Sequence, residues 1–383
     1  MKCPVCRYDS LLPFLERHNV PVHQNLLCAS QEAARAVKRG DLTLVMCGDC
    51  GFTFNQSFEE GLLSYGFQYD NTQTCSPAFE KYVDDIVAHL VEERGVVNKT
   101  IVEVGCGKGY FLEKLCVRAG NRGIGFDPSY VGPENRLDGR LSFVRSFYGV
   151  ENSDIPADVV VSRHVIEHVP KPMTLLGAVH NALAASGHAR VYFETPSLDW
   201  ILENMVVWDF FFEHCSYFAK DTLEYAFERA GFRAEEVREV FGGQYLAYEG
   251  RVVAVPEGRR PQIGGTLSEK AKRYAASEKV ELERWRKRLE EQASRGRTAI
   301  WGAGAKGVTL ANLADPDCEL LDCVVDLNPA KQGKYIPGTG HPIFSFESLG
   351  ERRVEVAILM NPNYREENQR LLYEAGIKTR LIE

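Results

Sequence analysis

The chain has 383 residues, of which 44% are hydrophobic and 26% charged, and its formal net charge is −8 at pH 7. This composition excludes a disordered chain, and the length predicts two or three domains. The acidic balance and the absence of basic runs argue against binding to nucleic acid. Neither an apolar run of membrane-spanning length nor a signal peptide is visible, so we expect a cytoplasmic protein without a membrane partner.

Two C-x-x-C pairs stand near the N-terminus, Cys3 with Cys6 and Cys47 with Cys50. Each such turn can direct two thiolates at one ion, so the two pairs together predict a closed tetrahedral zinc site. A closed site leaves no position for water, which indicates a structural role. A redox pair or unpaired thiols are the weaker alternatives, because no thioredoxin-like strand and helix surround either pair. The other cysteines are scattered and are interpreted as small buried residues.

The pattern of apolar residues divides the chain into five segments. Residues 1–56 form the cysteine module, and 57–98 form a helical connector. Residues 99–256 alternate strands with helices, which predicts an α/β domain with a doubly wound, mostly parallel sheet. Residues 257–297 are charge-rich and predict a helical linker, and 298–383 predict a second Rossmann-like α/β domain. The expected strands include Thr100–Val104, Gly123–Phe126, Asp158–Ser162, Ala189–Phe193 and Thr298–Trp301.

The first strand of the larger α/β segment contains Glu103 and is followed by glycines at 105, 107 and 109 and then by a helix. Glycines let the backbone turn sharply and approach a ligand. The spacing G-x-G-x-G resembles the glycine loop of class I S-adenosylmethionine-dependent methyltransferases rather than the dinucleotide fingerprint. The next strand ends at Asp127, whose carboxylate can accept hydrogen bonds from both ribose hydroxyls of that cofactor. The expected cofactor contacts are Glu103, Gly105, Gly107, Gly109, Phe126, Asp127, Pro128, Phe147 and His164.

Further along, Glu213 and His214 lie next to one another among aromatic residues. Such surroundings shift pKa values and exclude water, and an imidazole suits proton transfer near neutral pH. On residue types alone, a structural hydrogen-bonded pair is the favoured interpretation. His164 and His168 are interpreted as residues that pack along the wall of the cofactor site.

The order of motifs along nearly the whole chain resembles the zinc-containing C-methyltransferases of deoxysugar biosynthesis, which methylate C3 of nucleotide-linked 4-keto sugars. The segments that carry this resemblance are the two cysteine pairs, the first glycine loop, Glu213-His214, Gly242-Gly243, Trp301–Asn312, Asp326–Lys334 and Pro337–Pro342. The resemblance implies that Glu213 and His214 belong to the reaction centre. It also implies a tyrosine from the connector there, either Tyr65 or Tyr69, of which we prefer Tyr69 because Asp, Asn and Thr follow it.

The chain departs from that family at two positions. Phe211 stands where the family has Tyr, and Phe241 stands where it often has His. Both changes remove a hydrogen-bonding group from the acceptor pocket. The identity of the acceptor therefore stays open, and so does methylation of oxygen or nitrogen instead of carbon.

A second glycine loop, Gly302–Gly307, follows a predicted strand, and Asp326 lies about twenty residues beyond it, as in the dinucleotide fingerprint. The resemblance instead assigns this unit to the acceptor, whose pyrophosphate the loop's N–H groups could hold. Acceptor contacts are expected from Phe211, Gly243, Lys306 and Asn312. A less favoured alternative is that the protein is an NAD-dependent oxidoreductase that binds NAD at this loop. A further alternative is that the loop binds no ligand and only packs two layers of the domain together.

These features predict a methyltransferase that acts on a carbon next to a ketone. His214 takes the proton, Glu213 orients His214, and Tyr69 or Tyr217 stabilises the enolate. The enolate carbon then attacks the methyl group of S-adenosylmethionine, which the protein aligns with the acceptor. The expected partner is a small molecule, by resemblance a nucleotide sugar, and the expected assembly is a monomer or homodimer.

Overall fold

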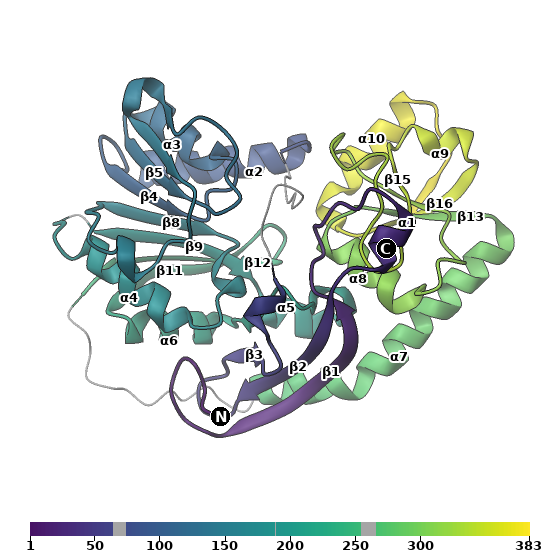
Figure 1. Ribbon diagram of the computed structural model, residues 1–383, viewed down its shortest axis with the longest axis horizontal. Coiled ribbons are helices and arrows are strands. Elements are labelled where there is room, and N and C mark those ends of the chain that lie inside the picture. Colours follow the sequence, from purple (N-terminus) through teal and green to yellow (C-terminus); the bar gives the residue numbers. More distant parts are fainter. Residues whose placement is uncertain (64–73, 188, 254–265) are drawn as a thin grey trace.

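A computed structural model describes residues 1–63, 74–187, 189–253 and 266–383 (Figure 1). These residues form three β-sheets, of four, eight and five strands. The prediction of an α/β fold with two Rossmann-like units is confirmed. Among the described residues, no helix combines the length and the apolar character of a membrane span.

The four-stranded sheet is antiparallel and has the order β1-β2-β3-β10. Its strands are β1 (Leu11–Pro21), β2 (Arg39–Cys47), β3 (Thr53–Asn55) and β10 (Ser216–Tyr217), and the helix α1 (Gln31–Arg35) lies between β1 and β2. The sequence did not predict β10, which comes from the segment assigned to the central domain. The cysteine module is therefore completed by residues that follow Glu213 and His214.

The eight-stranded sheet has the order β11-β12-β9-β8-β4-β5-β7-β6. Its strands are β4 (Thr100–Val104), β5 (Arg122–Phe126), β6 (Asn135–Arg136), β7 (Leu141–Val144), β8 (Val159–Arg163), β9 (Arg190–Pro196), β11 (Phe232–Val240) and β12 (Tyr245–Val252). The strands from β9 to β7 in this order are parallel, as predicted, and the outer ones are antiparallel.

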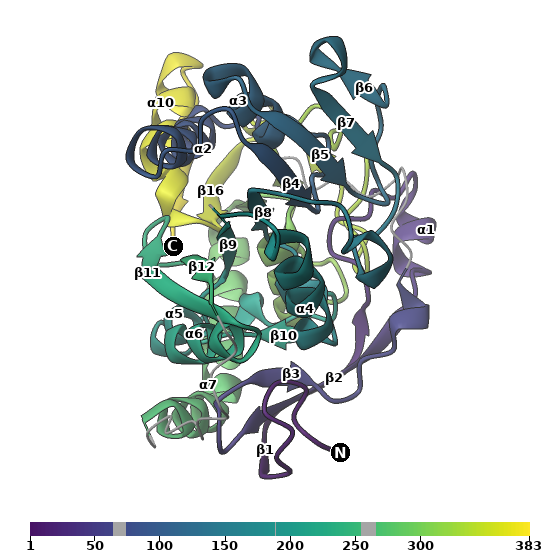
Figure 2. The same ribbon diagram turned by 90° about the vertical axis from the view of Figure 1, so that its left-hand side faces the viewer.

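Helices cover both faces of this sheet (Figure 2). The helices α2 (Pro77–Ala88) and α3 (Tyr110–Ala119) pack on one face, and α4 (Pro172–Leu183) and α6 (Lys220–Arg229) pack on the other. Each helix buries an apolar stripe against the strands, which is the arrangement that the alternation of strands and helices predicted. A short helix, α5 (Leu198–Glu203), follows β9.

The five-stranded sheet is parallel and has the order β15-β14-β13-β16-β17. Its strands are β13 (Arg297–Trp301), β14 (Cys323–Val325), β15 (Ile343–Phe344), β16 (Val354–Leu359) and β17 (Arg380–Ile382), and its helices are α8 (Ala305–Ala314), α9 (Ser348–Glu351) and α10 (Arg365–Glu374). The predicted linker is the long helix α7 (Thr266–Arg295).

One hydrophobic cluster joins the cysteine module to the C-terminal lobe. It contains side chains from β1, β2, α5, α7 and α8. Within it, the buried Arg17 of β1 donates to the carboxylate of Glu278 on α7 and to the backbone carbonyls of Val207 and Phe210. Because breaking such a buried pair is costly, this contact fixes the hairpin β1–β2 relative to the C-terminal lobe.

Candidate active site

The loop between β4 and α3 has a backbone that requires glycine. Gly105, Gly107 and Gly109 have φ angles of +73°, +53° and +81°. A Cβ atom at Gly105 would lie 2.1 Å from Val165 Cγ2, and one at Gly109 would lie 2.3 Å from the ring of Phe143. At Gly107 a Cβ would meet nothing within 4 Å. Positions 105 and 109 therefore let the loop pack closely, and position 107 faces open space that a ligand can enter.

Asp127 ties this loop to the end of β5. Its Oδ2 accepts a hydrogen bond from the Gly107 N–H (2.8 Å), and its Oδ1 accepts from the Ser129 N–H (2.7 Å) and hydroxyl (2.6 Å). Phe126 supports the loop through its carbonyl, which accepts from the N–H of Gly105. Its side chain is buried against Tyr148, and its contact with the cofactor stays a prediction. The contacts expected from Pro128 and from the exposed Phe147 stay predictions.

Glu103 lies beneath the glycine loop and is 3% exposed. Its Oε2 has no hydrogen-bond partner in the described part of the chain. Burial raises the pKa of Glu103 to about 8, although the nearby Arg163 opposes this shift. A cationic ligand at this position would supply the missing partner and favour the ionised carboxylate.

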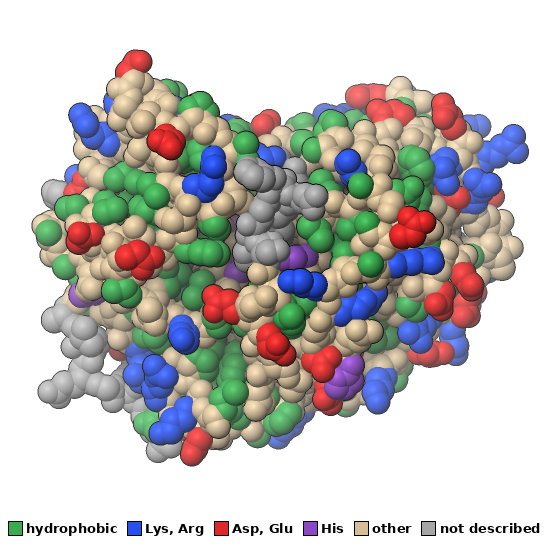
Figure 3. All heavy atoms as spheres, viewed as in Figure 1, with side chains coloured by type: hydrophobic (Ala, Val, Ile, Leu, Met, Phe, Trp, Pro, Cys, Tyr) green, Lys and Arg blue, Asp and Glu red, His purple; other side chains and the backbone are tan. Residues whose placement is uncertain are grey.

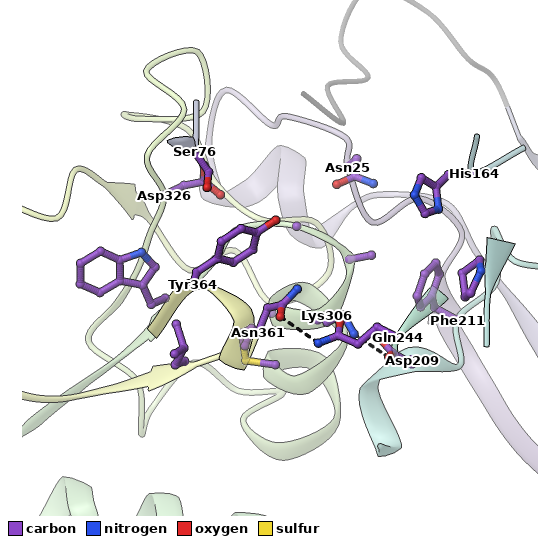
Figure 4. Close-up of a pocket in the computed structure, with 18 of the residues that line it drawn as sticks. Asn25, Ser76, His164, Asp209, Phe211, Gln244, Lys306, Asp326, Asn361 and Tyr364 are labelled. Atoms are coloured by element: carbon purple, nitrogen blue, oxygen red, sulfur yellow. Dashed lines mark hydrogen bonds and ion pairs between the residues drawn. The ribbon is translucent and has the colours of Figure 1, made fainter. Parts of the chain in front are cut away.

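A cavity of about 240 Å³ lies between the two lobes. His164 and Pro196, at the ends of β8 and β9, face Gly302 and Met360, which follow β13 and β16. The carboxyl ends of two parallel sheets therefore border one space, which is where α/β proteins bind ligands. Figure 4 shows Tyr364 and Asn361 on one side of this space and His164 and Phe211 on the other. In the space-filling view, histidine side chains are visible at the seam between the lobes (Figure 3).

Glu213 is fully buried, and both of its carboxylate oxygens are engaged by the cysteine module. Oε1 lies 2.8 Å from Nδ1 of His23, and Oε2 accepts a hydrogen bond from the Gln24 N–H (2.9 Å). Our expectation that Glu213 orients His214 is therefore wrong. The carboxylate instead holds the segment that follows β1 against the cavity, which the next residue, Asn25, lines.

His214 lines the cavity and packs on Phe211 and His168, with ring centroids 4.1 and 4.7 Å away. Its Nδ1 is buried and makes no hydrogen bond to any described residue. Burial, reinforced by the nearby His168, His164 and Lys306, lowers the pKa of His214 well below its usual range. The side chain is therefore a neutral imidazole that carries a lone pair.

A second Glu-His pair, Glu167 and His168, meets His214 at the cavity wall. One possible ligand atom from each of the three residues lies within 4.8 Å of the others. Glu167 Oε2 accepts a hydrogen bond from the Thr195 hydroxyl (3.1 Å), and His168 Nδ1 lies 3.0 Å from the Glu213 carbonyl. His164 and His168, which we interpreted as wall or packing residues, both line the cavity. The available signal was the recurrence of the Glu-His dipeptide after a strand.

Two family models and one curated C-methyltransferase match this chain. Residues 78–237 match the family model described as a methyltransferase domain, and residues 268–378 match the one described as a C-methyltransferase C-terminal domain. The C-methyltransferase NovU of Streptomyces niveus is 27% identical over 400 residues, which cover 98% of this chain and 93% of NovU. The chain is an S-adenosylmethionine-dependent methyltransferase.

Other similar proteins match smaller shares of this chain. The ubiquinone biosynthesis O-methyltransferase of Vibrio atlanticus (strain LGP32) is 27% identical over 113 residues, which cover 28% of this chain and 47% of that protein. The solved structure of magnesium protoporphyrin IX methyltransferase from Synechocystis PCC 6803 aligns with 49% of this methyltransferase and 89% of its own chain, at 14% identity and a TM-score of 0.37.

The two tyrosines predicted at the reaction centre have different outcomes. Tyr69 lies outside the residues that the structure describes. Tyr217 is buried in the hydrophobic cluster beside Phe210, and its hydroxyl exchanges hydrogen bonds with the backbone N–H (3.2 Å) and carbonyl (3.3 Å) of Phe211. Tyr217 does not line the cavity, although its ring centroid lies 6.0 Å from that of His214, so its role at the reaction centre stays a prediction.

Of the four expected acceptor contacts, two line the cavity. Phe211 forms part of the wall, and Lys306 donates to Asp209 Oδ2 (2.7 Å, Figure 4). Asn312 does not line the cavity, because its amide donates to the carbonyls of Val308 and Pro337 and ties α8 to a loop. Gly243 also lies outside the lining. The lining residue there is Gln244, whose amide donates to Asn361 Oδ1 (2.9 Å).

The second glycine loop is built like the first. Asp326 Oδ2 accepts a hydrogen bond from the Ala303 N–H (2.8 Å), as Asp127 does in the other domain. A Cβ atom at Gly307 would lie 2.0 Å from the Gly302 carbonyl oxygen, so this glycine is required for the close packing of α8 on the loop. The first turn of α8 lines the cavity, and no side chain caps it. Its N–H groups are therefore available to an anionic ligand.

The four N-terminal cysteines come together in the fold. Cys3 and Cys50 have sulfur atoms 3.6 Å apart, and those of Cys6 and Cys47 are 3.4 Å apart. All four sulfurs lie within 4.8 Å of one another, and the side chains are buried. A tetrahedral ion with Zn–S bonds of ~2.3 Å separates its ligands by ~3.8 Å, so this set of thiols fits a structural zinc ion.

Proposed function

We propose that this methyltransferase transfers the methyl group of S-adenosylmethionine to a carbon atom next to a carbonyl of a small molecule. The observation that carries the proposal is the cavity between the lobes, where imidazoles lie between the carboxyl ends of the two parallel sheets. The match with the C-methyltransferase NovU over 98% of the chain supports carbon as the methylated atom.

The chemistry needs a base, because a carbon next to a ketone must lose a proton before it can attack a methyl group. An imidazole of the cavity wall takes this proton. His214 is the residue that the sequence selects, and burial keeps it neutral and able to accept. The side chains of Phe211 and His168 shield it from water, which strengthens the electrostatic stabilisation of the enolate.

The cofactor is assigned to the first glycine loop. Glu103 would hold its ammonium group and Asp127 its ribose, and the sulfonium supplies an electrophilic methyl group when bound. The role of the protein is to place the acceptor carbon beside this loop and to exclude water. The strand β8 links the two sites, because it pairs with β4 and is followed directly by His164 on the cavity wall.

We assign a nucleotide-linked keto sugar as the acceptor. The uncapped N-terminus of α8 and Lys306 offer N–H groups and positive charge to a diphosphate. The apolar ring of Phe211 lies against His214, where a less hydroxylated part of a deoxysugar would fit. Zinc bound by the four cysteines would hold the base of the hairpin β1–β2, from whose far end His23 reaches Glu213.

The test uses S-adenosylmethionine with a 13C-labelled methyl group and a nucleotide-linked 4-keto deoxysugar. Methylation should appear at carbon in the NMR spectrum of the product, and His214→Ala should abolish it while the Kd for S-adenosylmethionine stays within twofold. His18→Ala, at an exposed histidine, is the matched control. A methyl group on oxygen or nitrogen would refute carbon methylation, and normal turnover by His214→Ala would remove the role of this imidazole.

A further inference from the structure

Arg163, the last residue of β8, carries a buried N–H group that the protein leaves unsatisfied. Its side chain is 10% exposed, and its Nη2 has no hydrogen-bond partner within the described ranges of the chain. A guanidinium has five N–H donors and keeps its charge, so a buried donor without an acceptor is costly. Because buried polar groups are nearly always paired, this atom indicates that an acceptor group of a ligand is missing beside it.

The register of the sheet places Arg163 near Glu103. Glu103 on β4 lies opposite Val161 on β8, and Arg163 follows two residues, or ~7 Å, further along β8, so the two side chains are on the same face of the sheet. Burial raises the pKa of Glu103, and the charge of Arg163 opposes this shift. The Oε2 of Glu103 is also unsatisfied, so this oxygen and the Nη2 of Arg163 do not bond to each other. The pair therefore offers one donor and one acceptor to a ligand.

The guanidinium of Arg163 is held in place from two sides. Its Nε donates to the fully buried carboxylate of Glu194 on β9 (2.5 Å), which also accepts hydrogen bonds from the hydroxyls of Tyr82 (2.5 Å) and Tyr192 (2.6 Å). Its central carbon lies 5.0 Å from the ring centre of Phe111, in the first turn of the helix that follows the glycine loop. These contacts fix the guanidinium beside the loop and leave Nη2 available to a ligand.

We propose that Arg163 binds the carboxylate of S-adenosylmethionine and so fixes the methionyl end of the cofactor at the first glycine loop. That end is a zwitterion, with an ammonium and a carboxylate on one carbon atom. The proposed function pairs the ammonium with Glu103, and the free N–H of Arg163 is the complementary partner for the carboxylate. The inference rests on that assignment of the cofactor and adds a binding residue that the sequence did not reveal.

Decarboxylated S-adenosylmethionine distinguishes this role from a structural one. The analogue keeps the sulfonium and the ammonium and lacks only the carboxylate. If Arg163 only balances the buried charge of Glu194, its replacement changes the Kd values of both ligands by the same factor. If it binds the carboxylate, its replacement removes the difference between them. The ratio of the two Kd values also cancels any effect on the ionisation of Glu103, because both ligands carry the ammonium.

The test measures both Kd values by isothermal titration calorimetry at pH 7 with the zinc-loaded full-length enzyme. The wild type should bind S-adenosylmethionine about tenfold or more tightly than the decarboxylated analogue, and Arg163→Gln should bind the two ligands within about twofold of each other. Glu103→Gln removes the partner of the ammonium and should keep the wild-type ratio. Arg122→Gln, at an exposed arginine that begins β5, is the matched control and should also keep it.

Arg163→Lys covers the case in which Arg163→Gln does not fold, because it keeps a positive charge opposite Glu194. An ammonium cannot present the planar fork of a guanidinium, so the ratio should still fall by about threefold or more. A wild-type ratio in a folded Arg163 variant would overturn the proposal, and so would equal affinities of the wild type for the two ligands. The position of the 13C-labelled methyl group in the product tests the proposed function independently of these affinities.

Discussion

The buried carboxylate of Glu103 predicts that binding of S-adenosylmethionine depends on pH. Burial raises the pKa of Glu103 to about 8, so the unliganded enzyme holds this group protonated at pH 7. The cofactor's ammonium favours the ionised form, so the proton must leave on binding. The apparent Kd then scales with 1 + 10^(pKa − pH), a factor of ~100 at pH 6 and ~11 at pH 7. Affinity should therefore rise about ninefold, or ~1.3 kcal/mol, between these values.

Isothermal titration calorimetry at pH 6, 6.5 and 7 measures this change, and the cofactor's amino group is charged throughout this range. Titrations in two buffers of different ionisation enthalpy should show release of nearly one proton per cofactor bound. Glu103→Gln, which cannot ionise, should bind with an almost constant Kd and should release no proton. If wild type and Glu103→Gln show the same slope, the dependence comes from another group and the assigned contact between Glu103 and the ammonium is wrong.

Three further changes test other parts of the molecule. Cys47→Ser removes one thiolate of the four, so zinc measured by mass spectrometry should fall from one ion per chain to near zero; undiminished zinc would contradict the site. Gly307→Ala forces a Cβ atom against the Gly302 carbonyl, so it should lower the free energy of unfolding, measured by urea titration, by about 1–3 kcal/mol. Gly304→Ala is its control, because the nearest atom to a Cβ at that position is 3.9 Å away. This control should change the free energy of unfolding by less than ~0.5 kcal/mol. Glu213→Gln should cost about 1–3 kcal/mol through its contacts with His23, and an unchanged unfolding curve would show that these contacts are not needed.

Local patterns allowed much of the fold to be predicted. The strand expected at Thr100–Val104 is β4 with the same bounds, because a run of β-branched residues ends there in a glycine turn. The cysteine pairs came together because each C-x-x-C turn already directs two thiols at one point. In such cases, neighbours in the sequence determine the geometry.

The errors arose where distant segments decide the outcome. Glu213 and His23 are separated by 190 residues, so nothing near Glu213 showed that its carboxylate would be engaged. The strand β10 has only two residues and exists because β3 pairs with it. Asn312 was predicted from the resemblance to contact the acceptor, but a resemblance gives only the position of a residue along the chain. The side chain points to the carbonyls of Val308 and Pro337, and sequence position alone does not reveal these contacts.

The pairing of β10 with β3 limits where this enzyme can be divided into fragments that fold. A recombinant fragment that starts after residue 56 would expose an unpaired strand next to the reaction centre and would leave Glu213 without His23. Chimeras built to exchange acceptor preference between related enzymes should therefore transfer the N-terminal hairpin together with the segment from Phe211 to Tyr217. A junction placed between them would separate two halves of one folding unit.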